Sequence, residues 1–229
     1  MTGSGILGGN DLEHANLIES NVTGVNFNSP IQFNRIARNT IGIVATNGQL
    51  IVHNLIYRNT QTALKIQGRN DVRVFQNTFY APAGDNIRID GASSQIEIRN
   101  NIFWVEAGYD IYVADNSISG FFSDYNDLHA SGAGKLVYWT RDFIDILDWQ
   151  EDVHEYDLNS IGYTVVNPLW SEPRFLNRGQ DDYRIFDQVA RLRFTSPTID
   201  AGDPRSDQGL PPYYNNLLTN PGFESGITG

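Results

Sequence analysis

The sequence contains no cysteine, which excludes disulfide bonds and thiolate metal sites and leaves the redox compartment open. Basic residues are also scarce: 16 Lys and Arg stand against 27 Asp and Glu, so the net charge is −11. A chain this acidic is a poor candidate for binding the phosphate backbone of a nucleic acid. No apolar run approaches the roughly 18 residues of a membrane helix, so we expect a soluble protein without membrane insertion.

Familiar enzyme motifs are absent as well. The sequence has no Gly-rich phosphate loop, no dinucleotide fingerprint, no Gly-x-Ser-x-Gly and no His-Glu-x-x-His. The four histidines lack the spacing of metal ligands. The first nine residues show neither the basic nor the apolar region of a signal peptide, so none is expected in this sequence. Evidence for function must therefore come from the pattern of the remaining residues.

Asparagine is abundant, with 23 residues, and six of them mark a repeat. Each of the six is followed two residues later by a large apolar residue, at intervals of 18, 20, 23, 24 and 25 residues. The six pairs are Asn16/Ile18, Asn34/Ile36, Asn54/Ile56, Asn77/Phe79, Asn101/Phe103 and Asn126/Leu128. The intervals contain further alternating apolar pairs, such as Ile87/Ile89 and Ile111/Val113, separated by turn residues. This period of two predicts short strands.

Strand repeats of this length cannot bury their apolar faces alone and must stack on one another. We therefore predict an all-β fold, a right-handed parallel β-helix of about six coils over residues 11–139. The apolar residue of each pair is expected in an inward row, and the asparagines in a hydrogen-bonded internal ladder. Residues 140–210 are expected to pack on the side of the coils or to cap their C-terminal end, with a short helix over 143–149 capped by Thr140 or Asp142. Residues 1–10 are expected to be disordered or added to the natural chain, and 211–229 to link to a following module.

From Asn16 to Tyr138 the sequence resembles the right-handed parallel β-helix proteins, including the pectate-lyase-like enzymes that act on polysaccharides. Asn167–Trp170 and Ser196–Pro204 resemble the closing segment of secreted bacterial members, and Asn216–Ser225 resembles the start of a jelly-roll carbohydrate-binding module. The resemblance covers about residues 11 to 210 and implies the fold, a polysaccharide partner and an extracellular or cell-surface location. It does not select an activity, since such coils host lyases, hydrolases, epimerases, tailspikes and adhesins.

A row of basic and phenolic side chains is expected on one outer face. By alternation, Lys65, Arg88 and Tyr112 point outward from three successive coils. Like charges on adjacent strands are destabilising unless something compensates them, so Lys65 and Arg88 are candidates for binding a uronate carboxylate. A lyase would then use Lys65, with a lowered pKa, as the base and Tyr112 as the proton donor.

Two carboxylates flank this row. Asp90 and Asp110 are expected on the same face, where they would hold calcium, activate water or serve as the carboxylate pair of a hydrolase. The alternative, which we consider the more frequent outcome, is a solvated face on which Arg88 pairs with both aspartates. Calcium is thus a candidate cofactor, and the metal ligands remain open.

A second outward row follows the asparagines at an offset of three residues. It consists of Ala37, Tyr57, Tyr80, Trp104 and His129. The aromatic members, together with Trp139 on the face of Lys65 and Arg88, are expected to offer flat surfaces for sugar stacking. The alternative is that residues 140–210 lie over the row and bury it.

Two functions follow from these patterns. The first is an extracellular carbohydrate-active β-helix that binds a polysaccharide, with cleavage left open and lyase chemistry favoured over hydrolysis if it occurs. The second is a non-catalytic stalk, adhesin or fibre module with end-to-end contacts to neighbouring modules or chains. The acidic run from Asp145 to Asp157 lacks the spacing of an EF-hand and is interpreted as a solvated face. Whether the protein is an enzyme is left open by the sequence.

Overall fold

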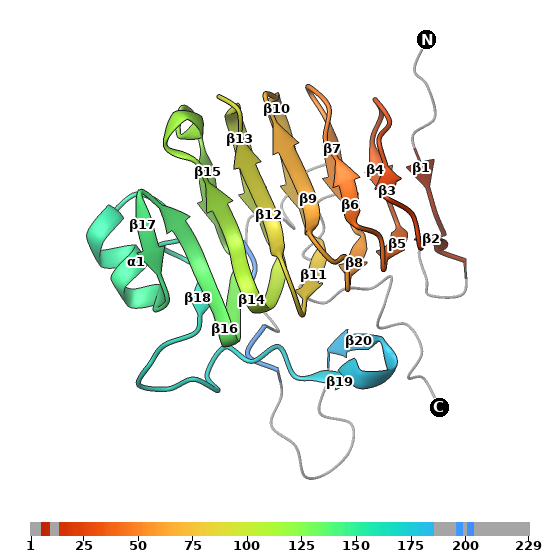
Figure 1. Ribbon diagram of the computed structural model, residues 1–229. Coiled ribbons are helices and arrows are strands. Elements are labelled where there is room, and N and C mark those ends of the chain that lie inside the picture. Colours follow the sequence, from red (N-terminus) through yellow and green to blue (C-terminus); the bar gives the residue numbers. More distant parts are fainter. Residues whose placement is uncertain (1–5, 10–13, 186–195, 199–200, 204–229) are drawn as a thin grey trace.

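The computed structural model describes residues 6–9, 14–185, 196–198 and 201–203, and it shows a parallel β-helix (Figure 1). Strands of successive coils stack in register on three faces, and all these pairings are parallel. The coils make about five full turns, slightly fewer than expected, since the first coil is described only in part. In the part of the chain that the structure describes, no helix is long and apolar enough to cross a membrane.

The three faces differ in their connections. The first face contains β1 (Ile6–Leu7), β4 (Ile31–Gln32), β7 (Leu50–Val52), β10 (Asn70–Phe75), β13 (Ser94–Arg99) and β15 (Phe122–Asp124). The second contains β2 (Asn16–Glu19), β5 (Asn34–Ala37), β8 (Leu55–Tyr57), β11 (Thr78–Ala81) and the first halves of β14 (Ile102–Val113) and β16 (Asp127–Trp139). The third contains β3 (Thr23–Val25), β6 (Ile41–Val44), β9 (Thr62–Gln67), β12 (Asp85–Asp90) and the second halves of β14 and β16. The two long strands therefore join the second face to the third.

The predicted inward row and asparagine ladder are both confirmed. Consecutive members of the row from Ile18 to Leu128 are partners in the strand register, and all except Ile18 are fully buried. The asparagines bond from coil to coil; for example, Asn77 Nδ2 donates to Asn101 Oδ1 at 3.1 Å. The residue before each of five ladder asparagines has a φ between 54° and 57°, in the left-handed region that turns the chain sharply. These five residues are Phe33, His53, Gln76, Asn100 and Tyr125.

The end of the coils is closed by a cap. It consists of β17 (Arg141–Phe143), α1 (Ile146–Val153) and β18 (Ile161–Gly162), which lie beside β16 (Figure 1). The helix begins three residues later than predicted because Phe143 still pairs with Val137 in a sheet. Its N-cap is Asp145, whose side chain accepts a hydrogen bond from the Leu147 amide, rather than Thr140 or Asp142.

A β-hairpin then returns along the second face. It is formed by β19 (Phe175–Asn177) and β20 (Asp182–Ile185), and we call residues 173–185 the strap. The predictions for residues 1–5, 10 and 211–229, and for residues 199–200 and 204 of the closing segment, lie outside the described residues.

Candidate functional site

The row predicted on the third face is present in the structure. Lys65 on β9 is the register partner of Arg88 on β12, and Arg88 is the partner of Tyr112 on β14. All three side chains are partly exposed, whereas the residues on either side of them, such as Ile87 and Ile89, are buried. The geometry of adjacent, outward side chains therefore matches the prediction, and their catalytic roles stay a prediction.

The register of the last coil differs from the prediction because β16 contains one extra residue. Val105 pairs with Ala130, but two residues later Ala107 pairs with Ala133, so a β-bulge lies between them. This shift places Tyr138, rather than Val137, next to Tyr112 in the outward row.

Trp139 is displaced by the same bulge. It pairs with Val113, an inward residue, and its ring packs against Phe121, Trp149 and Tyr156 at centroid distances of 5.4, 5.9 and 5.1 Å. The expectation that Trp139 faces outward beside Lys65 and Arg88 is therefore wrong, because the tryptophan anchors the cap to the core.

Three tyrosines gather at the end of the outward row, and we call Tyr109, Tyr112 and Tyr138 the tyrosine cluster. The rings of Tyr112 and Tyr138 stack at 4.6 Å with an interplanar angle of 12°. Tyr109 contacts both edge-on, at 5.5 and 5.9 Å. The Arg88 guanidinium lies 3.9 Å from the centre of the Tyr112 ring, so a cation extends the stack toward Lys65.

The charges on this face are largely paired. Arg88 Nη1 donates to Asp85 Oδ2 at 3.0 Å, and its Nε lies 3.4 Å from Asp90 Oδ2. The alternative of a solvated face is therefore the one observed for the pair of Arg88 and Asp90. The second carboxylate that pairs with Arg88 is that of Asp85, whereas Asp110 was expected. Burial raises the pKa of the Asp85 carboxyl, and the ion pair with Arg88 opposes this rise. Lys65 Nζ has no ion pair among the residues that the structure describes.

Lys135 places another cation beside the tyrosine cluster. Its Nζ donates to Asp142 Oδ2 at 2.5 Å and lies 3.4 Å from the Tyr109 hydroxyl, which itself donates to Asp142 Oδ1 at 2.6 Å. Hydrogen bonding to Lys135 lowers the pKa of Asp142. This network fixes the orientation of the Tyr109 ring at the margin of the face.

Asp110 does not lie on the outer face. It is completely buried, in one row with Ala63 and Leu136 of the hydrophobic core, and its Oδ1 accepts a hydrogen bond from Asn86 Nδ2 at 2.8 Å. Burial raises its pKa well above the ordinary value. The predicted use of Asp90 and Asp110 as a surface pair for calcium, water or hydrolysis is therefore wrong, because Asp110 is buried among core residues whereas Asp90 is partly exposed.

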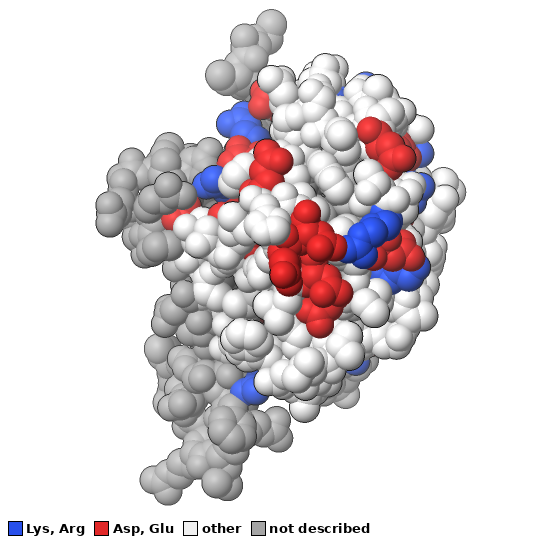
Figure 2. All heavy atoms as spheres, turned by 90° about the vertical axis from the view of Figure 1, so that its left-hand side faces the viewer, with Lys and Arg blue, Asp and Glu red and all other residues white. Residues whose placement is uncertain are grey.

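Within the described ranges, no group of three or more histidine or acidic side chains is arranged to hold a metal ion. The exposed acidic side chains of α1 and the turn after it gather at the capped end of the molecule (Figure 2). Asp148, Glu151, Asp152 and Glu155 are exposed, in agreement with the solvated face predicted from the sequence. The prediction is wrong for Asp145, which caps α1, and for Asp157, which is fully buried and accepts hydrogen bonds from Trp149 Nε1 and Ser160 Oγ.

The aromatic row of the second face is covered by the strap. Tyr57, Tyr80 and Trp104 point away from the core as predicted, but they are only 0%, 4% and 7% exposed. Tyr183 of β20 lies 5.0 Å from Tyr57 and 5.5 Å from Tyr80, and Phe175 of β19 stacks on Trp104 at 5.9 Å. The covering alternative is therefore the one observed, and these three rings do not form an open stacking surface for sugars.

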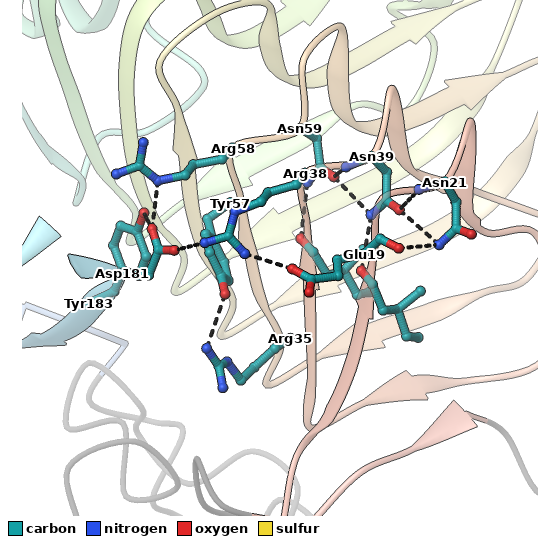
Figure 3. Close-up of polar contacts among 12 residues, drawn as sticks. Glu19, Asn21, Arg35, Arg38, Asn39, Tyr57, Arg58, Asn59, Asp181 and Tyr183 are labelled. Carbon is teal, nitrogen blue, oxygen red and sulfur yellow. Dashed lines mark hydrogen bonds and ion pairs between the residues drawn. The ribbon is translucent and has the colours of Figure 1, made fainter. Parts of the chain in front are cut away.

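Polar contacts hold the strap in place (Figure 3). Asp181 accepts from Arg58 Nε at 2.6 Å and also pairs with Arg38, which in turn contacts Glu19 at 2.6 Å. The Tyr183 hydroxyl donates to the same Asp181 carboxylate at 3.1 Å. An aspartate of the strap is thus bound by arginines from two different coils.

A second asparagine ladder lies beside these arginines and was missed by the sequence analysis. Asn21, Asn39 and Asn59 bond from coil to coil, with Asn39 Nδ2 donating to Asn59 Oδ1 at 3.1 Å (Figure 3). The sequence feature that could have revealed this ladder is the Arg-Asn pair, which is repeated at 38–39 and 58–59. Tyr109, Tyr138, Lys135 and Asp142 were also missed, since only the corrected register of β16 brings them together.

Comparisons with known proteins address the fold. The chain matches the family described as "Right handed beta helix region" over residues 4–147, more than half of its length. No curated protein and no solved structure was found to match it.

Proposed function

Because the chain belongs to the right-handed β-helix family, we propose that it is an extracellular or cell-surface protein that binds a polysaccharide along its third face. The observation that carries this proposal is the tyrosine cluster stacked on Arg88. These rings are partly exposed on a regular sheet surface, while the aromatic side chains of the second face are buried.

The chemistry of the third face suits a chain of sugars. Aromatic faces bind the apolar faces of pyranose rings, and tyrosine hydroxyls at the same surface exchange hydrogen bonds with sugar hydroxyls. The row from Lys65 to Tyr138 crosses four adjacent strands and is roughly 14 Å long at about 4.8 Å per strand. An elongated ligand fits this row better than a single ring does.

Cleavage of a uronate polymer is the second candidate, favoured by the register of Lys65, Arg88 and Tyr112 and by the fact that Lys65 forms no ion pair with any described residue. In that reaction the Lys65 amine would take the proton next to the carboxylate, the carbon–oxygen bond to the leaving sugar would break, and Tyr112 would protonate the leaving oxygen. Arg88 would have to exchange its contacts with Asp85 and Asp90 for the substrate carboxylate.

Binding is tested on a panel of neutral and acidic polysaccharides by calorimetry. Tyr138→Ala is expected to weaken binding about tenfold, which corresponds to roughly 1.4 kcal/mol. Trp170→Ala serves as the control, because Trp170 is 57% exposed and lies outside this row. Equal affinity of Tyr138→Ala and the parent would exclude the tyrosine cluster. Failure to bind any polymer would favour the stalk or adhesin function.

Cleavage is tested on the same panel with and without a chelator. Ultraviolet absorbance reports the unsaturated products of a lyase, and reducing ends report hydrolysis. If the protein is a lyase, Lys65→Ala is expected to abolish activity and leave the circular dichroism spectrum unchanged, since a partly exposed residue adds little packing. Unchanged turnover in this variant would remove Lys65 as the base.

A further inference from the structure

The cap leaves part of the last coil uncovered. β18 pairs with Asp127 and Leu128 at one end of β16, and β17 pairs with Val137–Trp139 at the other. Between them, residues 129–136 have no strand partner on the side of the cap, as far as the described residues extend. Residues 131–135 of this edge are partly or fully exposed, so their backbone groups are available to a ligand.

A cavity of about 280 Å³ lies at this edge. Its lining consists of Ala130–Lys135, Ile144 and Tyr163. The bulge of β16 shapes it, and two glycines make the bulge feasible. Gly132 has a φ of +61°, and a Cβ on Gly134 would lie 2.5 Å from the Val105 carbonyl oxygen. The small side chains in the lining leave the backbone accessible.

The lining combines apolar and polar elements in a way that suits one sugar ring. Ile144 and the Tyr163 ring give an apolar wall, while the open strand edge and the Lys135 ammonium group supply polar partners. Two of the three protons of Lys135 are directed at Asp142 and Tyr109, which leaves one for a ligand oxygen. The volume of about 280 Å³ is close to the lower end of the ~300–1,000 Å³ typical of small-molecule pockets, which suits a ligand as small as one sugar ring.

We propose that this pocket binds the terminal sugar of the polysaccharide whose following residues lie on the tyrosine cluster. Lys135 connects the two surfaces, because it lines the pocket and also contacts the Tyr109 hydroxyl. This inference rests on the proposed function. It adds that the protein recognises chain ends, so that short oligosaccharides with a free end bind through the pocket.

The experiment compares two tryptophan substitutions. Ala133→Trp fills the pocket from an exposed position, and Ala83→Trp places the same ring at an exposed alanine in the corresponding corner of another coil. Probes are glucose, galactose, mannose and galacturonate, their di- and trisaccharides, and the polymers selected above. Ala133→Trp is expected to weaken trisaccharide binding at least tenfold, and Ala83→Trp to leave it unchanged. Lys135→Met, which removes the charge at similar volume, is expected to weaken it as well.

The outcomes separate the two proposals. If Tyr138→Ala weakens polymer binding while Ala133→Trp and Lys135→Met bind trisaccharides as the parent does, the pocket is excluded and the proposed function stands. If the parent binds a monosaccharide or trisaccharide that Ala133→Trp does not, and binds no polymer, the pocket stands and the tyrosine cluster is excluded. Absence of binding to every probe excludes both.

Discussion

Each ladder asparagine inside the coils satisfies several backbone groups at once. Asn77 Nδ2 donates to the carbonyls of Ile51 and Phe75 at 2.9 Å, and its Oδ1 accepts from the backbone and side-chain amides of Asn54. Buried polar atoms that lose their partners cost more than the bond itself contributes. The ladder thus explains why asparagine, with a donor and an acceptor in one short side chain, recurs at this corner.

Replacing a ladder asparagine by alanine leaves these groups unpaired. Asn77→Ala and Asn101→Ala are each expected to lower the free energy of unfolding by about 1–3 kcal/mol, measured by denaturant titration. Asn167→Ala is the control, since Asn167 is exposed. Ladder variants as stable as the parent would contradict the internal hydrogen-bonded role.

Asp110 occupies a similar buried corner, with Asn86 as its partner, but carries an ionisable group. Its pKa is raised in the folded chain, so the folded state binds more protons than the unfolded state between the ordinary value of about 4 and the raised value. Stability consequently falls as the pH rises through this interval, and the full cost of the charge persists above it.

Asp110→Asn removes this cost and retains an oxygen for Asn86. The variant is expected to be more stable than the parent at pH 7, and the gain is expected to vanish below about pH 4. Unfolding titrations at both pH values test this, with the exposed Asp71→Asn as control. A variant less stable than the parent at pH 7 would show that the charged carboxylate is favourable in its site.

At the level of elements, the carboxylate of Asp181 joins the strap to two coils. Asp181 pairs with Arg38 and Arg58, and Tyr183 of the same segment covers Tyr57 and Tyr80. Asp181→Ala is expected to lower stability by about 1–2 kcal/mol and to speed amide hydrogen exchange in residues 175–185. Asp182→Ala is the matched control, because Asp182 pairs only with Arg184 of its own strand among the described residues. Equal exchange in both variants would mean that packing and the remaining polar contacts, such as the Arg178–Glu106 ion pair, are sufficient to hold the strap.

The elements differ in how far the sequence predicts them. The coils were predictable because each inward residue repeats at a nearly constant interval, which local alternation reveals. The register of β16 was not, since the stretch from Ala130 to Gly134 has no apolar alternation that would reveal an extra residue. The strap was not predictable either, because contacts such as Arg58 to Asp181 join residues 123 positions apart without a periodic signal. For the same reason the sequence identified the row of Lys65, Arg88 and Tyr112 but not the tyrosine cluster at its end.

On the scale of the whole molecule, the net negative charge disfavours the binding of an acidic polymer to the third face. The chain carries a net charge of −11, whereas the basic side chains of Arg88 and Lys135 are already paired with carboxylates. An acidic polymer is therefore repelled at distances where individual side chains do not act.

This balance predicts the salt dependence of binding. Raising the ionic strength from about 0.01 M to about 0.15 M shortens the screening length from roughly 30 Å to roughly 8 Å, which suppresses the repulsion between the molecule and a distant polymer. Affinity for polygalacturonate is accordingly expected to rise severalfold over this range, while affinity for a neutral polymer stays constant, as measured by calorimetry at pH 7. A fall in polygalacturonate affinity with salt would mean that Lys65 and Arg88 attract the carboxylates strongly enough to overcome the net charge. That result would favour the lyase reaction on this row over simple binding of a neutral chain.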